Sequence, residues 1–297
     1  MKSSLEKRSI LTEPLPSKAA AADHYALLDS GAEFKLERFG PKLIARPSSL
    51  ALWQKRLPPR WKEADAVFDP DRGWKFRGTR FEVWSMRCGE AQLELRLQNN
   101  GQVGIFPDHL AYLESLKKFA ARLPTGARAL NLYAYTGLAT CTLAALGISV
   151  THVDLSKTAL SWAKRNLELS QVASDAVRLI PEDAIKFVER ELRRGSKYDI
   201  IIADPPSFGR ISKTQSWKLE EHIVNLMGSL VELCTPKEAL LCITCHHSAF
   251  DQHVLYNLLA DSTGKRMKAA TALDLAIPEV DSQRSLPAGH CVLAELN

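Results

Sequence analysis

Strands and helices alternate strictly after Pro107, and this pattern constrains the fold more than any other feature of the chain. Repeated strand and helix units of this kind require a parallel sheet with right-handed crossovers, so we expect a doubly wound α/β fold. Apolar spacing predicts the helices and strands in the following order: helix 109–123, strand 129–133, helix 138–146, strand 150–154, helix 158–169, strand 177–180, helix 184–194, strand 198–203, a helix within 216–233, and strand 239–244.

The first hundred residues have a different pattern. Residues 1–22 are predicted to be a flexible tail, and residues 23–105 contain short apolar runs separated by turn residues. The run Leu93–Leu97, for example, alternates apolar and polar residues with period two. We therefore predict a small β-rich domain over 23–105 and the α/β domain over 106–297.

Positive charge is concentrated in this N-terminal part. The net charge is +5, and residues 1–100 hold 18 Lys and Arg against 13 Asp and Glu, so residues 101–297 are neutral overall. Four of these bases are interleaved with aromatic residues, as in surfaces that bind a polyanion and stack on its bases. The alternative is a strand pair with aromatic side chains inward and charges outward. The four bases are Arg72, Lys75, Arg77 and Arg80.

No apolar run approaches the roughly 20 residues that a membrane span needs. The run Ala19–Ala22 is also too short for a secretory signal. The six cysteines mostly lie in apolar stretches, as reduced core thiols do. We therefore expect a cytoplasmic protein without membrane contact, and the sequence carries no signal for an oligomeric state.

Several residues with binding chemistry follow the predicted strands, where doubly wound folds bind their ligands. Gly137 allows a tight turn after the first strand, and Asp154 after the second can accept hydrogen bonds from both hydroxyls of a ribose. Asp183 after the third strand can receive an adenine amine or cap the next helix. Two prolines fix the backbone after Asp204, close to Phe208, which can stack on a planar ring. The absence of G-x-G-x-x-G argues against NAD or FAD.

These segments resemble the class I S-adenosylmethionine-dependent methyltransferases, and among them the group that methylates 23S ribosomal RNA. The resemblance covers about residues 104–297 and rests on the segments 104–109, 131–137, 154–156, 163–166, 204–208 and 243–246. It implies a Rossmann-like methyltransferase sheet, S-adenosylmethionine as cofactor and RNA, in particular ribosomal RNA, as partner.

The resemblance also implies roles for individual residues. The expected cofactor-binding residues are Phe106, Asp108, Asn131, Tyr133, Tyr135, Thr136, Gly137, Asp154, Leu155, Ser156, Asp183, Ala184, Asp204 and Pro205. The expected substrate-binding residues are Pro206, Ser207 and Phe208, together with Arg72, Lys75, Arg77 and Arg80.

Cys245 is the candidate nucleophile. In cytosine C5 methylation a thiolate adds to C6 of the ring, and the resemblance places this thiolate in a Thr-Cys pair that matches Thr244 and Cys245. The alternative is a packed core cysteine without chemistry. Haem attachment needs an exported protein, and alternation along a strand directs Cys242 and Cys245 to opposite faces, which opposes a zinc or redox C-x-x-C site. We therefore expect no metal.

The preferred hypothesis is transfer of a methyl group from S-adenosylmethionine to a base in RNA, at cytosine C5 in large-subunit ribosomal RNA, with Cys245 and Asp204 as catalytic residues. One alternative is nitrogen methylation of guanine, adenine or a protein side chain. Another is a non-catalytic RNA-binding relative that has kept the fold.

Overall fold

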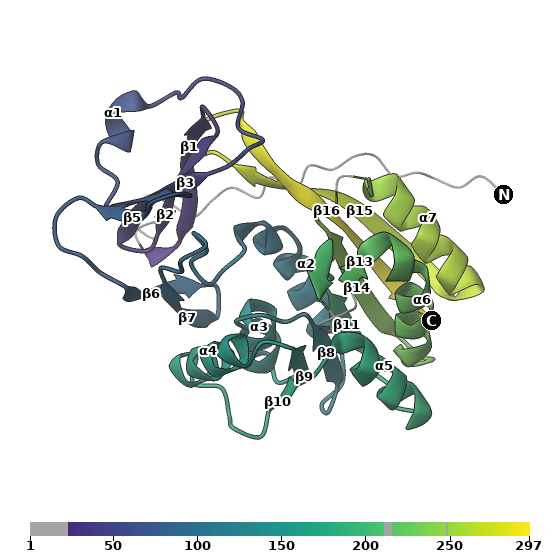
Figure 1. Cartoon of the computed structure of the whole chain (residues 1–297). Helices are drawn as coiled ribbons and strands as arrows, with labels where there is room; N and C mark the ends of the chain where they lie inside the picture. Colours follow the sequence, from purple (N-terminus) through teal and green to yellow (C-terminus); the bar gives the residue numbers. More distant parts are fainter. Residues whose placement is uncertain (1–22, 211–215, 248) are drawn as a thin grey trace.

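A computed structural model describes residues 23–210, 216–247 and 249–297 (Figure 1). The predicted tail, residues 1–22, lies outside the described residues. Within them, a seven-stranded sheet has the order β10-β9-β8-β11-β14-β16-β15. Its strands are β8 (Arg128–Leu132), β9 (Ser149–Asp154), β10 (Val177–Pro181), β11 (Ile200–Ala203), β14 (Ala239–Cys245), β15 (Met267–Pro278) and β16 (Ser285–Leu296).

The strand order reverses between β8 and β11. The chain runs outward from β8 through β9 to β10 and then crosses to β11 on the other side of β8. This arrangement confirms the predicted doubly wound α/β fold. A crevice forms where neighbouring crossovers leave in opposite directions, so the carboxyl ends of β8 and β11 are the expected place for a ligand.

The sheet is not wholly parallel, contrary to the expectation from strand and helix alternation. β16 is antiparallel to both β14 and β15 and lies between them. The reason is the short connection between β15 and β16, since a few residues can reverse the chain but cannot cross back over the sheet.

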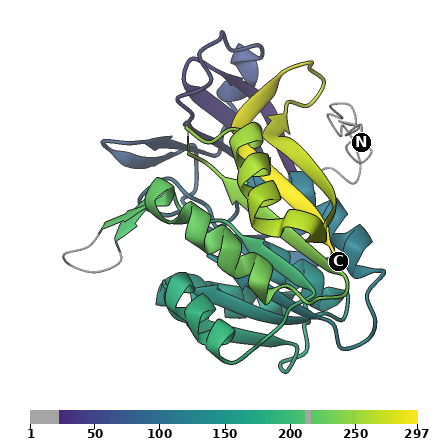
Figure 2. The same ribbon diagram turned by 90° about the vertical axis from the view of Figure 1, so that its right-hand side faces the viewer.

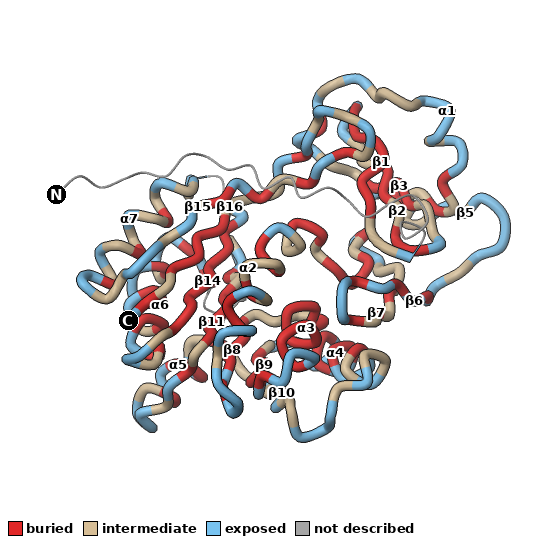
Figure 3. The backbone as a smooth tube through the Cα atoms, turned by 180° about the vertical axis from the view of Figure 1, so that it is seen from behind, coloured by how far each residue is buried: buried red, intermediate tan, exposed pale blue. Residues whose placement is uncertain are grey.

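Helices cover both faces of the sheet. The 3₁₀ helix η2 (Pro107–His109), α2 (Leu110–Ala120), α3 (Leu138–Ala145) and α4 (Lys157–Leu169) lie on one face (Figure 1). On the other face lie α5 (Ala184–Arg193), α6 (Leu219–Leu233) and α7 (Gln252–Thr263), with the short η3 (Gly264–Arg266) after α7. The two layers bury separate apolar cores against the sheet, so the central strands are almost fully buried (Figure 3).

The predicted β-rich region forms two separate sheets. The first has the order β1-β2-β3-β4-β5, with the short helix α1 (Pro58–Trp61) before β4. Its strands are β1 (Tyr25–Gly31), β2 (Phe34–Phe39), β3 (Lys42–Pro47), β4 (Ala66–Asp69) and β5 (Gly73–Phe76). The second is a hairpin of β6 (Val83–Cys88) and β7 (Ala91–Arg96) that lies against α3 and α4. A further hairpin, β12 (Phe208–Arg210) with β13 (Ser216–Lys218), follows β11.

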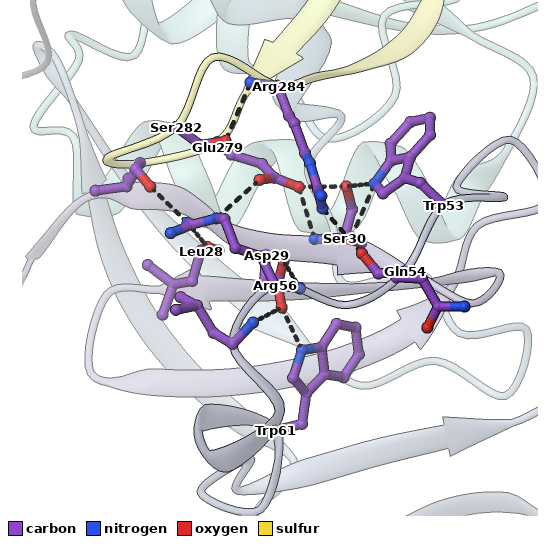
Figure 4. A network of polar contacts seen from close by, with 12 residues as sticks. Leu28, Asp29, Ser30, Trp53, Gln54, Arg56, Trp61, Glu279, Ser282 and Arg284 are labelled. Carbon is purple, nitrogen blue, oxygen red and sulfur yellow. Dashed lines mark hydrogen bonds and ion pairs between the residues drawn. The ribbon is translucent and has the colours of Figure 1, made fainter.

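The β15 and β16 ribbon extends beyond the large sheet and reaches the N-terminal sheet (Figure 2). At the contact, Glu279 accepts hydrogen bonds from the backbone N–H and the hydroxyl of Ser30 at 2.8 and 2.6 Å (Figure 4). Arg56 lies 3.5 Å from the same carboxylate and donates to the carbonyl oxygen of Val280. Contacts therefore cross the boundary predicted at residues 105 and 106.

No helix among the described residues is long and apolar enough to span a membrane.

Candidate active site

A cavity of about 850 Å³ opens at the carboxyl ends of β8, β9, β10 and β11, at the switch in strand order. The N-terminal sheet and the tip of the β15 and β16 ribbon also contribute to its wall. It is lined by Lys35, Ser48, Phe106, Asp108, Tyr133, Tyr135, Val153, Asp154, Leu155, Ser156, Glu182, Asp183, Ala184, Asp204, Pro205, Pro206, Trp217, His246, Ile277, Leu286, Pro287 and Ala288.

The loop after β8 has an unusual backbone. Tyr133, Tyr135 and Gly137 all have a positive φ, at 55°, 50° and 88°. Such values are strained for tyrosine, and they persist only where neighbouring contacts hold them. Asp154 supplies one such contact, because its Oδ2 accepts the backbone N–H of Tyr135 at 2.8 Å. Thr136 donates its hydroxyl hydrogen to the carbonyl oxygen of Gly104 and so ties the loop to the segment before η2.

Asp154 ends β9 and belongs to two turns at once. Its Oδ1 accepts the backbone N–H of Ser156, and the Ser156 hydroxyl in turn caps α4 by accepting the N–H of Ala159. Burial raises the pKa of Asp154, against the lowering effect of its two backbone donors. A carboxylate offers about four acceptor positions, so two remain for a ligand. Leu155, beside it, is 59% exposed and offers an apolar surface to a flat ring.

Asp183 caps α5, because its Oδ1 accepts the backbone N–H of Lys186 at 3.1 Å. Asp183 and Ala184 also line the cavity. The two functions weighed for Asp183 from the sequence are therefore compatible, since capping uses one oxygen and leaves the other for a ligand donor.

Asp204 lies between two histidines at the inner end of the cavity. Its Oδ2 is 3.1 Å from His109 Nε2, and its Oδ1 is 3.2 Å from His246 Nε2. Thr244 donates its hydroxyl hydrogen to the same Oδ1. The Nδ1–H of His246 donates to the carbonyl oxygen of Ala288 at 2.7 Å, an assignment that follows from the acceptor. This bond directs Nε2 toward Asp204.

The charges in this cluster stabilise one another. Burial opposes ionisation of Asp204, but the two histidines hold the pKa of its carboxyl well below its usual range. Burial also opposes a charge on His246, but the hydrogen bond and charge of Asp204 raise its pKa to about 9. The same balance raises the pKa of His109 above its usual value. Near neutral pH the cluster thus holds the ionised carboxylate of Asp204 beside a protonated His246.

Two buried polar atoms at the cavity lack a hydrogen-bond partner among the described residues. They are the Oδ2 of Asp108 and the hydroxyl of Tyr133. Buried polar groups are nearly always paired, so both atoms are expected to bind a polar ligand. Ligand atoms of Asp108, His109 and His246 also lie within 4.8 Å of one another, a spacing that could hold a metal ion.

Some residues predicted for the site lie outside the main cavity. Asn131, Thr136 and Gly137 line a small adjoining cavity behind the β8 loop. Ser207 and Phe208 do not line the main cavity, and Phe208 is 66% exposed. Cys245 is fully buried in the core between the sheet and α6 and α7, and burial raises the pKa of its thiol.

The four predicted basic residues are exposed: Lys75 lies on β5, Arg72 directly before it, and Arg77 and Arg80 after it. Lys75 and Arg80 form surface ion pairs with Asp69 and Glu82, each at 2.7 Å. The aromatic side chains between the bases contact one another, as Phe76 does with Phe81 at 5.5 Å between ring centroids. The aromatic packing and the outward charges agree with the alternative, but the strand pair does not, because β5 pairs with β4 and β6 pairs with β7.

Sequence reasoning missed the part of the wall that comes from distant segments. His109 and His246 lie in the segments 104–109 and 243–246 on which the resemblance rests, but neither is among the predicted site residues, and the same holds for Val153 and Glu182 beside predicted strand ends. The missed residues from distant segments are Lys35, Ser48, Trp217, Ile277, Leu286, Pro287 and Ala288. No local pattern marks them, because tertiary contacts bring their strands to the cavity.

The fold, the acidic residues at successive strand ends and the unpaired polar atoms together define a class I methyltransferase site. The sequence profile of the family described as "S-adenosylmethionine-dependent methyltransferase" matches residues 62–281. The chain belongs to this family, and its cofactor is S-adenosylmethionine.

Solved structures agree with this assignment. A SAM-dependent methyltransferase from Agrobacterium tumefaciens is 33% identical, with a TM-score of 0.84 over 91% of this chain and 90% of that one. A putative SAM-dependent methyltransferase from Streptococcus mutans has a TM-score of 0.70 at 16% identity, over 92% of this chain and 75% of that one, and shows the same fold.

Curated relatives are named "Ribosomal RNA large subunit methyltransferase K/L". One from a Shewanella strain is 28% identical over 202 residues, which is 67% of this chain. Another, from Shewanella oneidensis, is 32% identical over 206 residues, which is 69% of this chain. The matched region spans only 27% and 28% of the length of these relatives.

Proposed function

We propose that this methyltransferase acts on a base of RNA in the large ribosomal subunit and that the accepting atom is a nitrogen of guanine or adenine. The names of the curated relatives support the substrate class. The exposed bases Arg72, Lys75, Arg77 and Arg80 support a polyanionic partner, because exposed cations interleaved with aromatic rings suit a nucleic acid backbone.

Three carboxylates and a leucine fit the cofactor. Asp154 would bind the two ribose hydroxyls, Asp183 the adenine amine, and Leu155 would cover one face of the adenine ring. The Oδ2 of Asp108, which has no hydrogen-bond partner among the described residues, would accept from the ammonium of the methionine part. When bound, the cofactor supplies a methyl group already activated on a sulfonium, so the protein has only to bind and orient it.

The target base would then lie between Pro205 and Pro206 on one side and the ribbon tip on the other. Asp204 is ionised, and it would accept a hydrogen bond from an N–H of the base. This bond orients the nitrogen and increases its electron density. The nitrogen lone pair would form the new bond to the methyl carbon, the sulfur would keep the electron pair of the broken bond, and the N–H proton would leave to water, because His246 is already protonated near neutral pH.

The burial of Cys245 is the observation that supports the nitrogen route over the cytosine C5 route. A covalent route needs a thiolate that reaches the face of the base. Cys245 has no exposed surface, its thiol pKa is raised, and it does not line the cavity. Asp204 and His246, in contrast, do line it. We therefore prefer direct transfer to nitrogen over the predicted route through Cys245.

A pair of variants tests this choice. Cys245→Ala is expected to keep turnover near the wild-type rate, whereas Asp204→Asn should lose at least about 100-fold in turnover. Calorimetric binding of S-adenosylhomocysteine by both variants controls for folding. RNA that carries 5-fluorocytosine should form no covalent complex with the wild type. Loss of turnover in Cys245→Ala with donor binding intact, or a trapped complex, would restore the C5 route.

A further inference from the structure

A second cavity of about 360 Å³ adjoins the methyl-transfer cavity on the side of the N-terminal sheet. Lys35, Phe106 and Asp108 line both cavities, so the two are continuous around these side chains. Arg46 and Gly101 line the second cavity but not the methyl-transfer cavity. The proposed donor residues at β9 and β10, Asp154 and Asp183, do not line the second cavity, so donor binding does not explain why this cavity is there.

Each of the three guanidinium nitrogens of Arg46 donates a hydrogen bond to another group of the protein. Its Nε and one terminal nitrogen donate to the two oxygens of Glu37 at 2.7 and 2.9 Å, and its other terminal nitrogen donates to the carbonyl oxygen of Gly101. Glu37 is fully buried, and it also accepts from the hydroxyl of Tyr25. Arg46 and Glu37 therefore neutralise each other as a rigid, buried pair.

Lys35 adds a further positive charge to this pair. Its ammonium lies 3.4 Å from Glu37, whose charge Arg46 already balances, and its side chain is only 18% exposed. Burial lowers the pKa of Lys35, against the raising effect of Glu37. The three side chains thus carry one net positive charge with little water around it, and Asp108 is the carboxylate that lines the same cavity. An anion in the cavity would replace the missing hydration.

The charges around the methyl-transfer cavity favour such an anion at Lys35. Asp108, Asp154, Glu182, Asp183 and Asp204 line the large cavity, and Lys35 is the one Lys or Arg among its described lining residues. Carboxylates repel the phosphates that precede and follow a target base. A nucleotide can bring its base to Asp204 only if its phosphate lies where a cation balances the negative charge of the phosphate.

We propose that Lys35 forms an oxyanion site that binds the backbone phosphate of the nucleotide being methylated. This inference rests on the proposed RNA substrate. The second cavity is large enough for a phosphate and lies on the side of the positively charged N-terminal part. It is not lined by Asp154 or Asp183, the residues proposed for the ribose and the adenine of the donor. The carboxylate of the methyl donor has the same chemistry, and the experiment separates the two anions.

The test compares Lys35→Met with the wild type on protein-free large-subunit ribosomal RNA from a strain that lacks the gene. Loss of one charge-assisted contact should raise the KM for this RNA roughly tenfold. It should also flatten the slope of log affinity against log salt by about 0.7. The affinity for S-adenosylmethionine, measured by calorimetry without RNA, should not change. Lys35→Arg keeps the charge and should restore RNA affinity.

Lys62→Met is the matched control, because Lys62 is exposed in the same part of the chain and lines neither cavity. Its KM and salt slope should equal those of the wild type. Weaker donor binding with unchanged RNA affinity in Lys35→Met would assign the site to the donor carboxylate and overturn the proposal, as would unchanged values throughout. Failure of the wild type to bind RNA would instead reject the proposed function, and this inference with it.

Discussion

Asp204 links the charge of the site to pH through its two histidine partners. Protonated His246 is stabilised in the folded state, where its pKa is about 9 against an ordinary value of 6.5. The groups that face it are Asp204, Asp108 and His109. Because the folded pKa is the higher one, this stabilisation is fully present below pH 6.5 and is lost as the pH rises through about 9.

We therefore expect the free energy of unfolding to fall between pH 6.5 and 9 more steeply in the wild type than in His246→Gln. Urea unfolding at several pH values measures this difference. An NMR titration of the His246 ring gives its pKa directly, and Asp204→Asn should move that pKa well below 9. Equal pH dependence in wild type and His246→Gln would contradict the account of this cluster.

Asp154 makes the clearest prediction for the donor site. Replacement by Ala removes the acceptors for the ribose hydroxyls and for two backbone N–H groups of the cavity loops. We expect Asp154→Ala to weaken S-adenosylmethionine binding by about 1 to 3 kcal/mol, as measured by calorimetry. Asp175→Ala, at an exposed position outside the cavity, is the control. Unchanged affinity in Asp154→Ala would remove this residue from the donor site.

At the scale of single residues, position after a strand carried most of the information. Asp154, Asp183 and Asp204 could be predicted as lining residues because each lies at the end of a strand or within two residues of it, and these strand ends face the cavity. Cys245 shows the limit of this reasoning. β14 continues through Cys245, which pairs with His290 of β16, so the Cys245 side chain packs in the core against the sheet. That pairing depends on a strand 45 residues further along the chain, and the local pattern carries no sign of it.

The hairpin of β6 and β7 is joined to α4 by contacts that the sequence did not predict. The indole N–H of Trp162 donates to the carbonyl oxygen of Glu94, and Asn166 accepts the backbone N–H of Glu94. Gly104 lies against the same Trp162, and a Cβ at Gly104 would lie 2.2 Å from the indole ring. The close approach of backbone and ring explains why a residue without a side chain stands there.

We expect Gly104→Ala to destabilise the protein by about 1 to 3 kcal/mol more than Gly126→Ala, measured by urea unfolding. Both glycines have a positive φ, but the space around Gly126 is open, so this control carries the backbone strain without the clash. Equal destabilisation by the two substitutions would show that Trp162 moves aside freely. The packing attributed to Gly104 would then be wrong.

At the scale of elements, the sequence predicted the strands and helices from β8 to β14 to within a few residues, except for the hairpin of β12 and β13, because apolar periodicity and caps such as Asp183 are local signals. It did not predict α7, β15 or β16. The two strands are 12 residues each and pair with each other and with β14, and half-polar segments of this kind become strands through that pairing.

Glu279 connects the two ends of the whole molecule, since it bonds to a residue 249 positions away in the chain. Glu279→Ala removes two hydrogen bonds to a buried charge and should destabilise the protein by about 2 to 3 kcal/mol. Trp53 and Trp61 belong to the same network, so their fluorescence in urea reports its loss (Figure 4). Glu63→Ala, which breaks an exposed ion pair with Arg60, should change stability by less than about 1 kcal/mol.

If Glu279→Ala unfolds like the wild type, the ribbon does not hold the N-terminal sheet in place. The sequence could predict two differently patterned regions, but not this contact between them. Their junction forms the cavity wall that carries Lys35 and Leu286–Ala288. For this reason the donor side of the site was predictable and the substrate side was not.

The most direct test of direct methyl transfer to a base nitrogen is nucleoside mass spectrometry of large-subunit ribosomal RNA from a strain that lacks the gene. We predict that one nitrogen-methylated purine disappears, returns when the wild-type gene is restored, and does not return with Asp204→Asn. Loss of 5-methylcytidine would contradict the nitrogen assignment. An unchanged set of nucleosides would contradict the assignment to large-subunit ribosomal RNA.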